Sequence, residues 1–77
     1  ENVPIEELEQ PENKIVIYTK RKAFNDHLEQ IISMYNYVPY KLRYNNFCCV
    51  KIHFNKDKRN LYLVVDPNNI LNPGKIL

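Results

Sequence analysis

The feature that most constrains this sequence is a period-two alternation of apolar and polar residues between residues 38 and 65. In the first run the apolar members are Val38, Tyr40, Leu42 and Tyr44, and in the second they are Cys48, Val50, Ile52 and Phe54. Such alternation predicts strands that place one row of side chains in a core and the other in water. We therefore expect strands at 38–44, 47–54 and 61–65, with a tight break at Asn45-Asn46 and a charged turn after Phe54.

A change of period upstream predicts one helix. The apolar stripe of a helix lying on a sheet is formed by Phe24, Leu28, Ile31, Ile32 and Tyr35. Thr19 is a candidate N-cap. Because Pro39 favours an extended residue before it, the helix should end near Asn36 or Tyr37.

The run Lys14–Tyr18 is β-branched and apolar on both faces, which predicts a strand in the interior of the sheet. The expected fold class is α+β, in the order β-α-β-β-β, with one helix packed on one face of a mostly antiparallel sheet. With 77 residues there is room for one core. The expected organisation is an acidic linker at 1–13, a small α+β binding domain at 14–67 and a C-terminal tail at 68–77.

Charge is unevenly distributed along the chain. Residues 1–12 hold five glutamates and no Lys or Arg, whereas residues 13–77 hold all 11 Lys and Arg residues against four acidic ones. The lead is either a solvated linker, with room for one docked turn, or a segment that competes for the basic surface. The first residue, Glu1, is not preceded by Met, which indicates a fragment of a longer protein.

The two cysteines, Cys48 and Cys49, are neighbours on a predicted strand, so they point to opposite faces and are poorly placed to bond each other. This indicates a reducing, intracellular setting, in the cytoplasm or nucleus. No apolar run approaches the roughly 18 residues that would span a bilayer.

No catalytic or metal-binding motif stands out, so we expect a non-enzyme without cofactors. Gly74 is the only glycine, which excludes phosphate-cradling glycine-rich loops. Ser33 lies inside the predicted helix, and Cys49 and His53 would be about 13 Å apart on an extended strand. Two cysteines and two histidines at these spacings do not match a zinc finger.

Two basic groups are candidate sites for an anionic partner. Lys20, Arg21 and Lys22 lie where the helix begins, next to its unpaired backbone N–H groups. These three cations either form an anion site or are solvated, with compensation from Asp26 or Glu29.

The second group is expected on the open face of the sheet and at the hairpin tip. Its members are Lys41, Arg43, Phe47, Lys51, His53 and Tyr62 on the face, and Lys56, Lys58 and Arg59 at the tip. Aromatic rings between cations are typical of surfaces that bind single-stranded nucleic acid. The alternative is an ordinary solvated face whose cations protect the sheet edges. Tyr40 and Tyr44 are assigned to packing beneath the helix.

We therefore predict a non-catalytic binding module for an anionic partner, with nucleic acid favoured. The alternative is a protein-interaction or regulatory domain of a larger protein. A helix followed by three antiparallel strands is similar to the front part of double-stranded-RNA-binding domains, without their second helix.

The layout of residues 15–65 also resembles kinase-associated C-terminal domains. It has a strand at Ile15–Tyr18, a basic junction at Thr19–Lys22, a helix at Phe24–Tyr37 and the three strands described above. The resemblance implies a regulatory role and, for some members, contact with anionic lipid.

Overall fold

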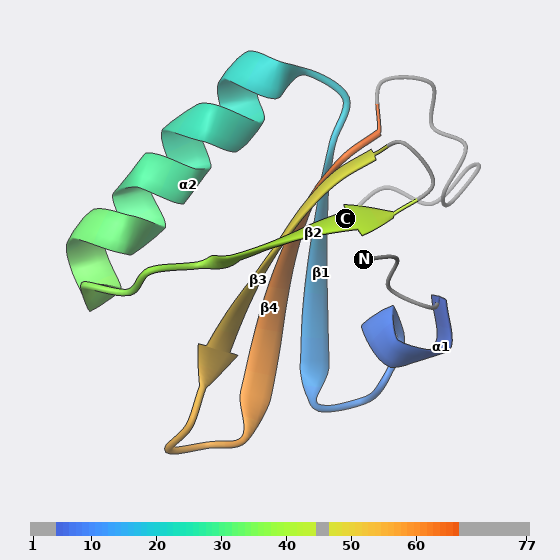
Figure 1. Cartoon of the computed structure of the whole chain (residues 1–77), viewed down its shortest axis with the longest axis vertical. Coiled ribbons are helices and arrows are strands. Elements are labelled where there is room, and N and C mark those ends of the chain that lie inside the picture. Colours follow the sequence, from blue (N-terminus) through green and yellow to red (C-terminus); the bar gives the residue numbers. More distant parts are fainter. Residues whose placement is uncertain (1–4, 45–46, 67–77) are drawn as a thin grey trace.

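The computed structural model describes residues 5–44 and 47–66, and Figure 1 shows how their elements are arranged. In chain order the elements are α1 (Ile5–Leu8), β1 (Asn13–Tyr18), α2 (Arg21–Tyr35), β2 (Tyr40–Tyr44), β3 (Phe47–Phe54) and β4 (Arg59–Val65). The predicted α+β class, with a main helix on a mostly antiparallel sheet, is confirmed. The predicted tail at 68–77 lies outside the described residues.

The four strands form one sheet in the order β1-β4-β3-β2. β2 pairs antiparallel with β3 and β3 antiparallel with β4, whereas β1 pairs parallel with β4. The prediction that Lys14–Tyr18 is an interior strand is therefore wrong, because β1 lies at an edge of the sheet. Its apolar side chains are covered by layers above and below the sheet rather than by strands on both sides.

α2 covers one face of the sheet. Phe24 and Ile31, only 1% and 4% exposed, pack with a buried cluster from β3 and β4 that comprises Val50, Ile52, Leu63 and Val65. The helix begins after Lys20 rather than Thr19, and Lys20 makes no capping hydrogen bond with its side chain. At the other end Asn36 adopts a left-handed conformation (φ 54°) and its N–H donates to the Ile32 carbonyl at 2.8 Å. The helix therefore ends where Pro39 predicted.

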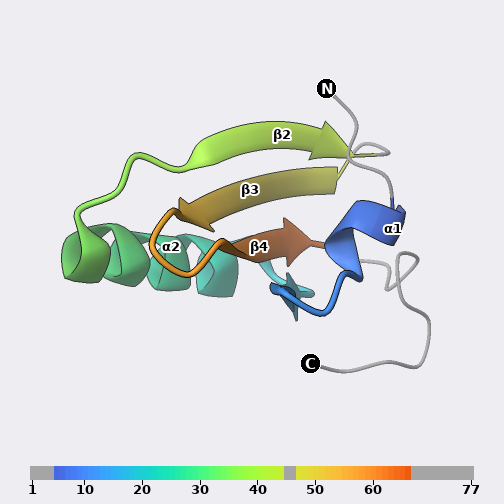
Figure 2. The same ribbon diagram turned by 90° about the horizontal axis from the view of Figure 1, so that it is seen from below.

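α1 covers the opposite face (Figure 2). Leu8 is 2% exposed and packs in a cluster with Cys49, Tyr62 and Val64. The Tyr62 hydroxyl donates to Glu7 Oε1 at 2.9 Å, and the Asn13 side-chain amide donates to the Glu7 carbonyl. The part of the acidic lead that contains α1 therefore contributes to the core, as a docked turn.

Candidate functional site

The cations predicted to share one face of the sheet are divided between two faces. Tyr44 pairs with Phe47, and this register places Lys41 opposite Val50. Directly opposite residues on antiparallel strands share a face, so Lys41 lies on the face that α2 covers, and Arg43, opposite Cys48, lies there too.

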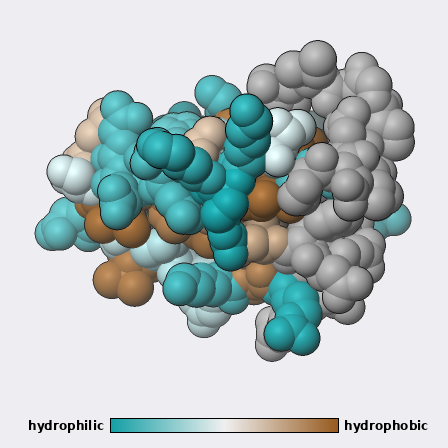
Figure 3. Space-filling model, turned by 90° about the horizontal axis from the view of Figure 1, so that it is seen from above, coloured by the Kyte–Doolittle hydropathy of each residue, from teal (hydrophilic) through white to brown (hydrophobic). Residues whose placement is uncertain are grey.

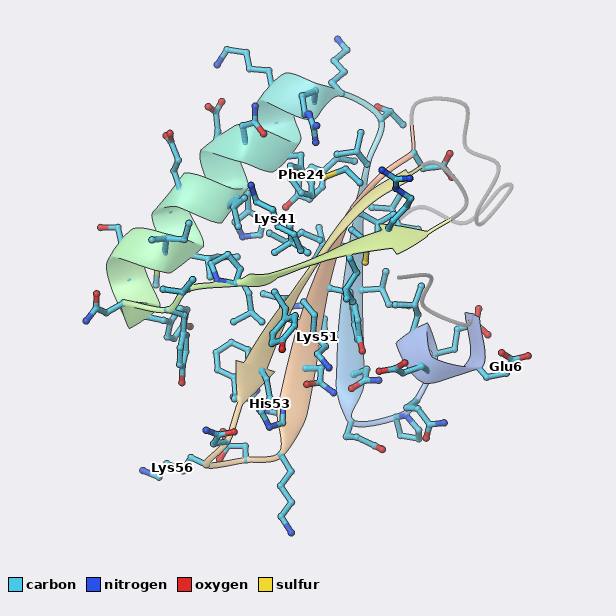
Figure 4. The ribbon with its side chains drawn as sticks, viewed as in Figure 1. Glu6, Phe24, Lys41, Lys51, His53 and Lys56 are labelled. Carbon is cyan, nitrogen blue, oxygen red and sulfur yellow. The ribbon has the colours of Figure 1, made fainter. Side chains whose placement is uncertain are left out.

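Lys51 and His53 project from the other face of β3. Lys51 lies opposite Tyr62 of β4, which belongs to the cluster beneath α1. Figure 4 shows Lys41 toward α2, and Lys51 and His53 together toward the hairpin end of β3. The expectation that these cations form one surface with Arg43 is therefore wrong.

Tyr62 was predicted to present its ring to a partner, and this is also wrong. Its side chain is 0% exposed, beneath Leu8. Burial, followed by the hydrogen bond to Glu7, raises the pKa of its hydroxyl. Conversely, Tyr40 was assigned to packing under the helix, yet it is 70% exposed and lies opposite Lys51. The side chains of Phe47 and Tyr44 lie outside the described set.

At the helix start, two of the three predicted cations have contacts within α2 itself. Lys22 Nζ lies 2.8 Å from Asp26 Oδ2, and this hydrogen bond raises the pKa of Lys22. The Arg21 guanidinium lies 5.5 Å from the centre of the Phe24 ring. These contacts favour the solvated alternative, with compensation by Asp26, over a dedicated anion site.

The cations at the hairpin tip, Lys56, Lys58 and Arg59, are all exposed. Arg59 lies 2.9 Å from Asp57 and 5.4 Å from the centre of the Phe54 ring. Because Arg59 pairs with Phe54 across the β3–β4 ladder, it projects on the α2 face.

On the opposite face, a row of hydrogen bonds crosses three strands. His53 Nδ1 lies 2.7 Å from Asn60 Oδ1, and Asn60 Nδ2 donates to Asn13 Oδ1 at 2.7 Å. Since Asn60 Oδ1 can only accept, His53 donates from Nδ1. The row ends on the Glu7 carbonyl through Asn13, so it helps to fix α1 on the sheet.

A pocket of about 330 Å³ lies between α2 and the sheet, and no feature of the sequence indicated it. Its lining comprises Lys14, Val16, His27, Gln30, Ile31, Met34, Tyr35, Phe54, Arg59 and Leu61. Lys14 pairs with Leu61, and Arg59 lies two residues before Leu61, so two cations project side by side on the α2 face. Such diagonal neighbours are about 7–8 Å apart.

Two of the residues that line this pocket, Met34 and Tyr35, belong to a run of exposed apolar side chains. All the large hydrophobic residues that are exposed in the described part of the chain fall within residues 32–40: Ile32, Met34, Tyr35, Tyr37, Val38 and Tyr40. Tyr40 lies on the other face of the sheet, opposite Lys51, and we call the other five residues the 32–38 patch. Two of its rings, Tyr35 and Tyr37, pack edge-on against Phe54 with centroids 5.4 Å and 5.6 Å away. Figure 3 shows hydrophobic residues at the surface among hydrophilic ones.

The described residues contain no cluster suited to metal binding. No three His, Cys, Asp or Glu side chains among them converge on a point that could hold a metal ion. Burial raises the pKa of Cys49 to about 12, so its thiol stays protonated near neutral pH. Neither described helix is long and apolar enough to cross a bilayer.

The chain matches no family model, no curated protein and no solved structure. The likeness to kinase-associated C-terminal domains therefore stays a prediction.

Proposed function

We propose that this chain is a non-catalytic binding module for a protein segment that carries both carboxylates and apolar anchors. The segment docks where the pocket under α2 meets the 32–38 patch. The observation that carries this proposal is the adjacency of two cations, Lys14 and Arg59, to a pocket whose wall continues into exposed aromatic side chains.

The patch has the composition of a protein interface. Aromatic residues, Met and Arg are enriched at the centres of such interfaces, where a few buried anchors supply most of the binding energy. Met34 is 65% exposed and Tyr35 49% exposed, and both also line the pocket. A partner that covers them would remove apolar surface from water at a gain of roughly 25 cal/mol per Å².

The two cations determine the charge of the partner. Within residues 5–44 and 47–66, Lys14 has no ion pair or side-chain hydrogen bond. Arg59 pairs with Asp57, but both side chains are more than half exposed, and exposed pairs contribute only about 0–1 kcal/mol. A carboxylate between Lys14 and Arg59 would relieve the repulsion of two neighbouring positive charges.

A protein segment is favoured over nucleic acid because Tyr62 and the strand cations do not form the exposed surface that was predicted to bind nucleic acid. Tyr62 is buried, and the strand cations lie on two faces. The exposed ring of Tyr35 instead lines a pocket that suits side chains, and the ring of Tyr37 stacks on it. Binding of nucleic acid is accordingly the competing outcome of the experiment.

Selection from a phage-displayed library of random peptides tests the proposal. Enriched peptides should combine Asp or Glu with Leu, Ile or aromatic residues. Their affinity should fall about tenfold or more in Met34→Asp and in Lys14→Glu, because each change removes one kind of contact. Lys51→Glu makes the same charge change on the opposite face, so it is the matched control and should bind normally.

A uridine-rich single-stranded RNA provides the competing arm. RNA affinity that falls about a thousandfold between 50 and 200 mM salt would indicate binding through many phosphates. If that affinity were also unchanged in Met34→Asp, and no peptide were enriched, the protein-segment proposal would be wrong and nucleic acid would replace it.

A further inference from the structure

We propose that the partner segment binds as an added strand along the outer edge of β1. This inference rests on the proposed function and specifies how the segment is held. Figure 1 shows β1 as the last strand of the sheet on the side away from β2.

The hydrogen bonds to β4 show which backbone groups of β1 point outward. The Tyr18 carbonyl accepts from the Asp66 N–H at 2.8 Å, and the Glu12 carbonyl accepts from the Asn60 N–H at 3.4 Å. In a parallel ladder, alternate residues direct both their N–H and C=O groups to the same neighbour. Residues 14 and 16 therefore bond inward to β4, and the N–H and C=O groups of Ile15 and Ile17 point outward.

No described strand pairs with these outward groups. The backbone groups of Asn13 point outward as well, two residues before those of Ile15. Its N–H donates to the Gln10 carbonyl at 2.9 Å, so among the described residues the outer edge of β1 is bonded only at its beginning. Further along, no hydrogen bond from another described residue reaches Ile15 or Ile17 on this side. Unpaired backbone groups of this kind are a template for strand addition.

The two edges of the sheet differ in how they are protected. β2, at the other edge, carries Lys41 and Arg43 and follows Pro39, which are common means of preventing unwanted strand pairing. β1 has the sequence Asn-Lys-Ile-Val-Ile-Tyr, with one charge and no proline. Its four apolar residues remain half-buried, so an added strand would complete their burial.

The pocket indicates which side chains the added strand would carry. Lys14 and Val16 of β1 line the pocket, opposite the α2 residues His27, Gln30 and Met34. Side chains of a neighbouring strand lie beside those of β1 on each face. An apolar side chain beside Val16 would thus enter the pocket, and a carboxylate beside Lys14 would pair with that cation. On the other face, β-branched residues would lie beside Ile15 and Ile17.

A synthetic peptide with this pattern, acetyl-Thr-Val-Leu-Val-Glu-Val-Thr-amide, is the probe. When extended, it places Leu and Glu on one face and three Val residues on the other. Titration into ¹⁵N-labelled protein should shift the Ile15 and Ile17 amide resonances and slow their hydrogen exchange. The amide of Val16, already bonded to β4, should exchange slowly with or without peptide.

Two N-methylated versions of the probe test the backbone pairing without altering the protein. One carries the methyl group on the Leu nitrogen and the other on the nitrogen of the central Val. Only alternate N–H groups of an added strand face β1, so one version should lose about tenfold or more in affinity while the other binds nearly as well as the parent.

Equal affinity of the two methylated peptides, or no binding of the parent peptide, would overturn the strand-addition proposal. The proposed function would then be tested separately, by the peptides selected from the library and by their affinity for Met34→Asp. A dimer formed without peptide, with slowed exchange at Ile15 and Ile17, would also overturn it, since a second copy would then be the occupant of this edge.

Discussion

Replacing Leu8 by alanine tests whether α1 is a working part of the core. Leu8 is only 2% exposed, and it packs with Tyr62 and Val64. Truncating a buried Leu to Ala costs roughly 2–5 kcal/mol in a rigid core. Because α1 is a single turn that can move away from the sheet, part of the cavity can close. We therefore expect a loss of about 2–3 kcal/mol, the lower part of that range.

For a domain of this size each kcal/mol corresponds to about 4–8 °C in Tm, so the midpoint should fall by roughly 8–24 °C. Urea unfolding followed by far-ultraviolet circular dichroism would measure the free energy directly. Glu9→Ala, at an exposed position of the same segment, is the control and should stay within about 0.5 kcal/mol of the parent.

Tyr62→Phe sharpens the same test, because it removes only the hydroxyl that donates to Glu7. Alone it should cost about 1 kcal/mol. Combined with Leu8→Ala it should cost less than the sum, since release of α1 already breaks that hydrogen bond. A Leu8→Ala variant as stable as Glu9→Ala would refute the reasoning and leave the lead as the linker that its composition predicted.

Three further outcomes follow from individual side chains. Lys20→Ser should stabilise the protein by about 1 kcal/mol in urea unfolding, because it supplies the missing N-cap of α2 and removes a cation from the positive end of the helix dipole; a loss of stability would contradict this. Lys58→Gly should raise Tm by a few degrees, since Lys58 has a φ of 53° and glycine adopts that conformation at a lower cost; an unchanged or lower Tm would argue against strain there. Stability should also fall as pH rises above about 9. Burial raises the pKa of Cys49 from 9.0 to about 12 and also raises that of Tyr62, so both groups keep their protons when folded and lose them when unfolded. Urea midpoints that stay constant from about pH 8 to pH 11 would contradict this linkage.

The sequence predicted most of the elements because local signals dominate where they begin and end. The alternation that ends at Phe54 matches the end of β3, and the effect of Pro39 matches the end of α2 at Tyr35. The start of α2 was less well predicted, since Thr19 is a better capping residue than Lys20 but does not occupy the cap. Phe24, near the start of α2, packs on the sheet, and local sequence signals do not record this tertiary contact.

The candidate site was predicted poorly because both faces of the sheet are apolar. Alternation on β3 could not show that Cys49 lies in the core beneath α1, while Val50 lies in the core beneath α2. The length of the connection between the two strands, residues 45–46, was nevertheless enough to predict their register. A two-residue connection pairs Tyr44 with Phe47, and that register already separates Lys41 from Lys51.

The pocket and the open edge of β1 depend on contacts between distant segments, which the hydrophobic periodicity of the sequence does not predict. Lys14 and Arg59 are 45 residues apart in the sequence. They lie close together only because β1 pairs parallel with β4. The same pairing makes β1 an edge strand, although its apolar composition is typical of an interior one. α1 and α2, on the two faces of the sheet, leave these side chains half-buried.

By itself, the sequence determined the helix, the strands and the uneven distribution of charge, because hydrophobic period, proline and turn residues act over a few positions. Tertiary structure decided the order of the strands, the face on which each cation lies and the place where exposed rings meet a pocket. Those properties arise from pairing between distant segments, and their energy comes from burying surfaces that meet only in the folded chain.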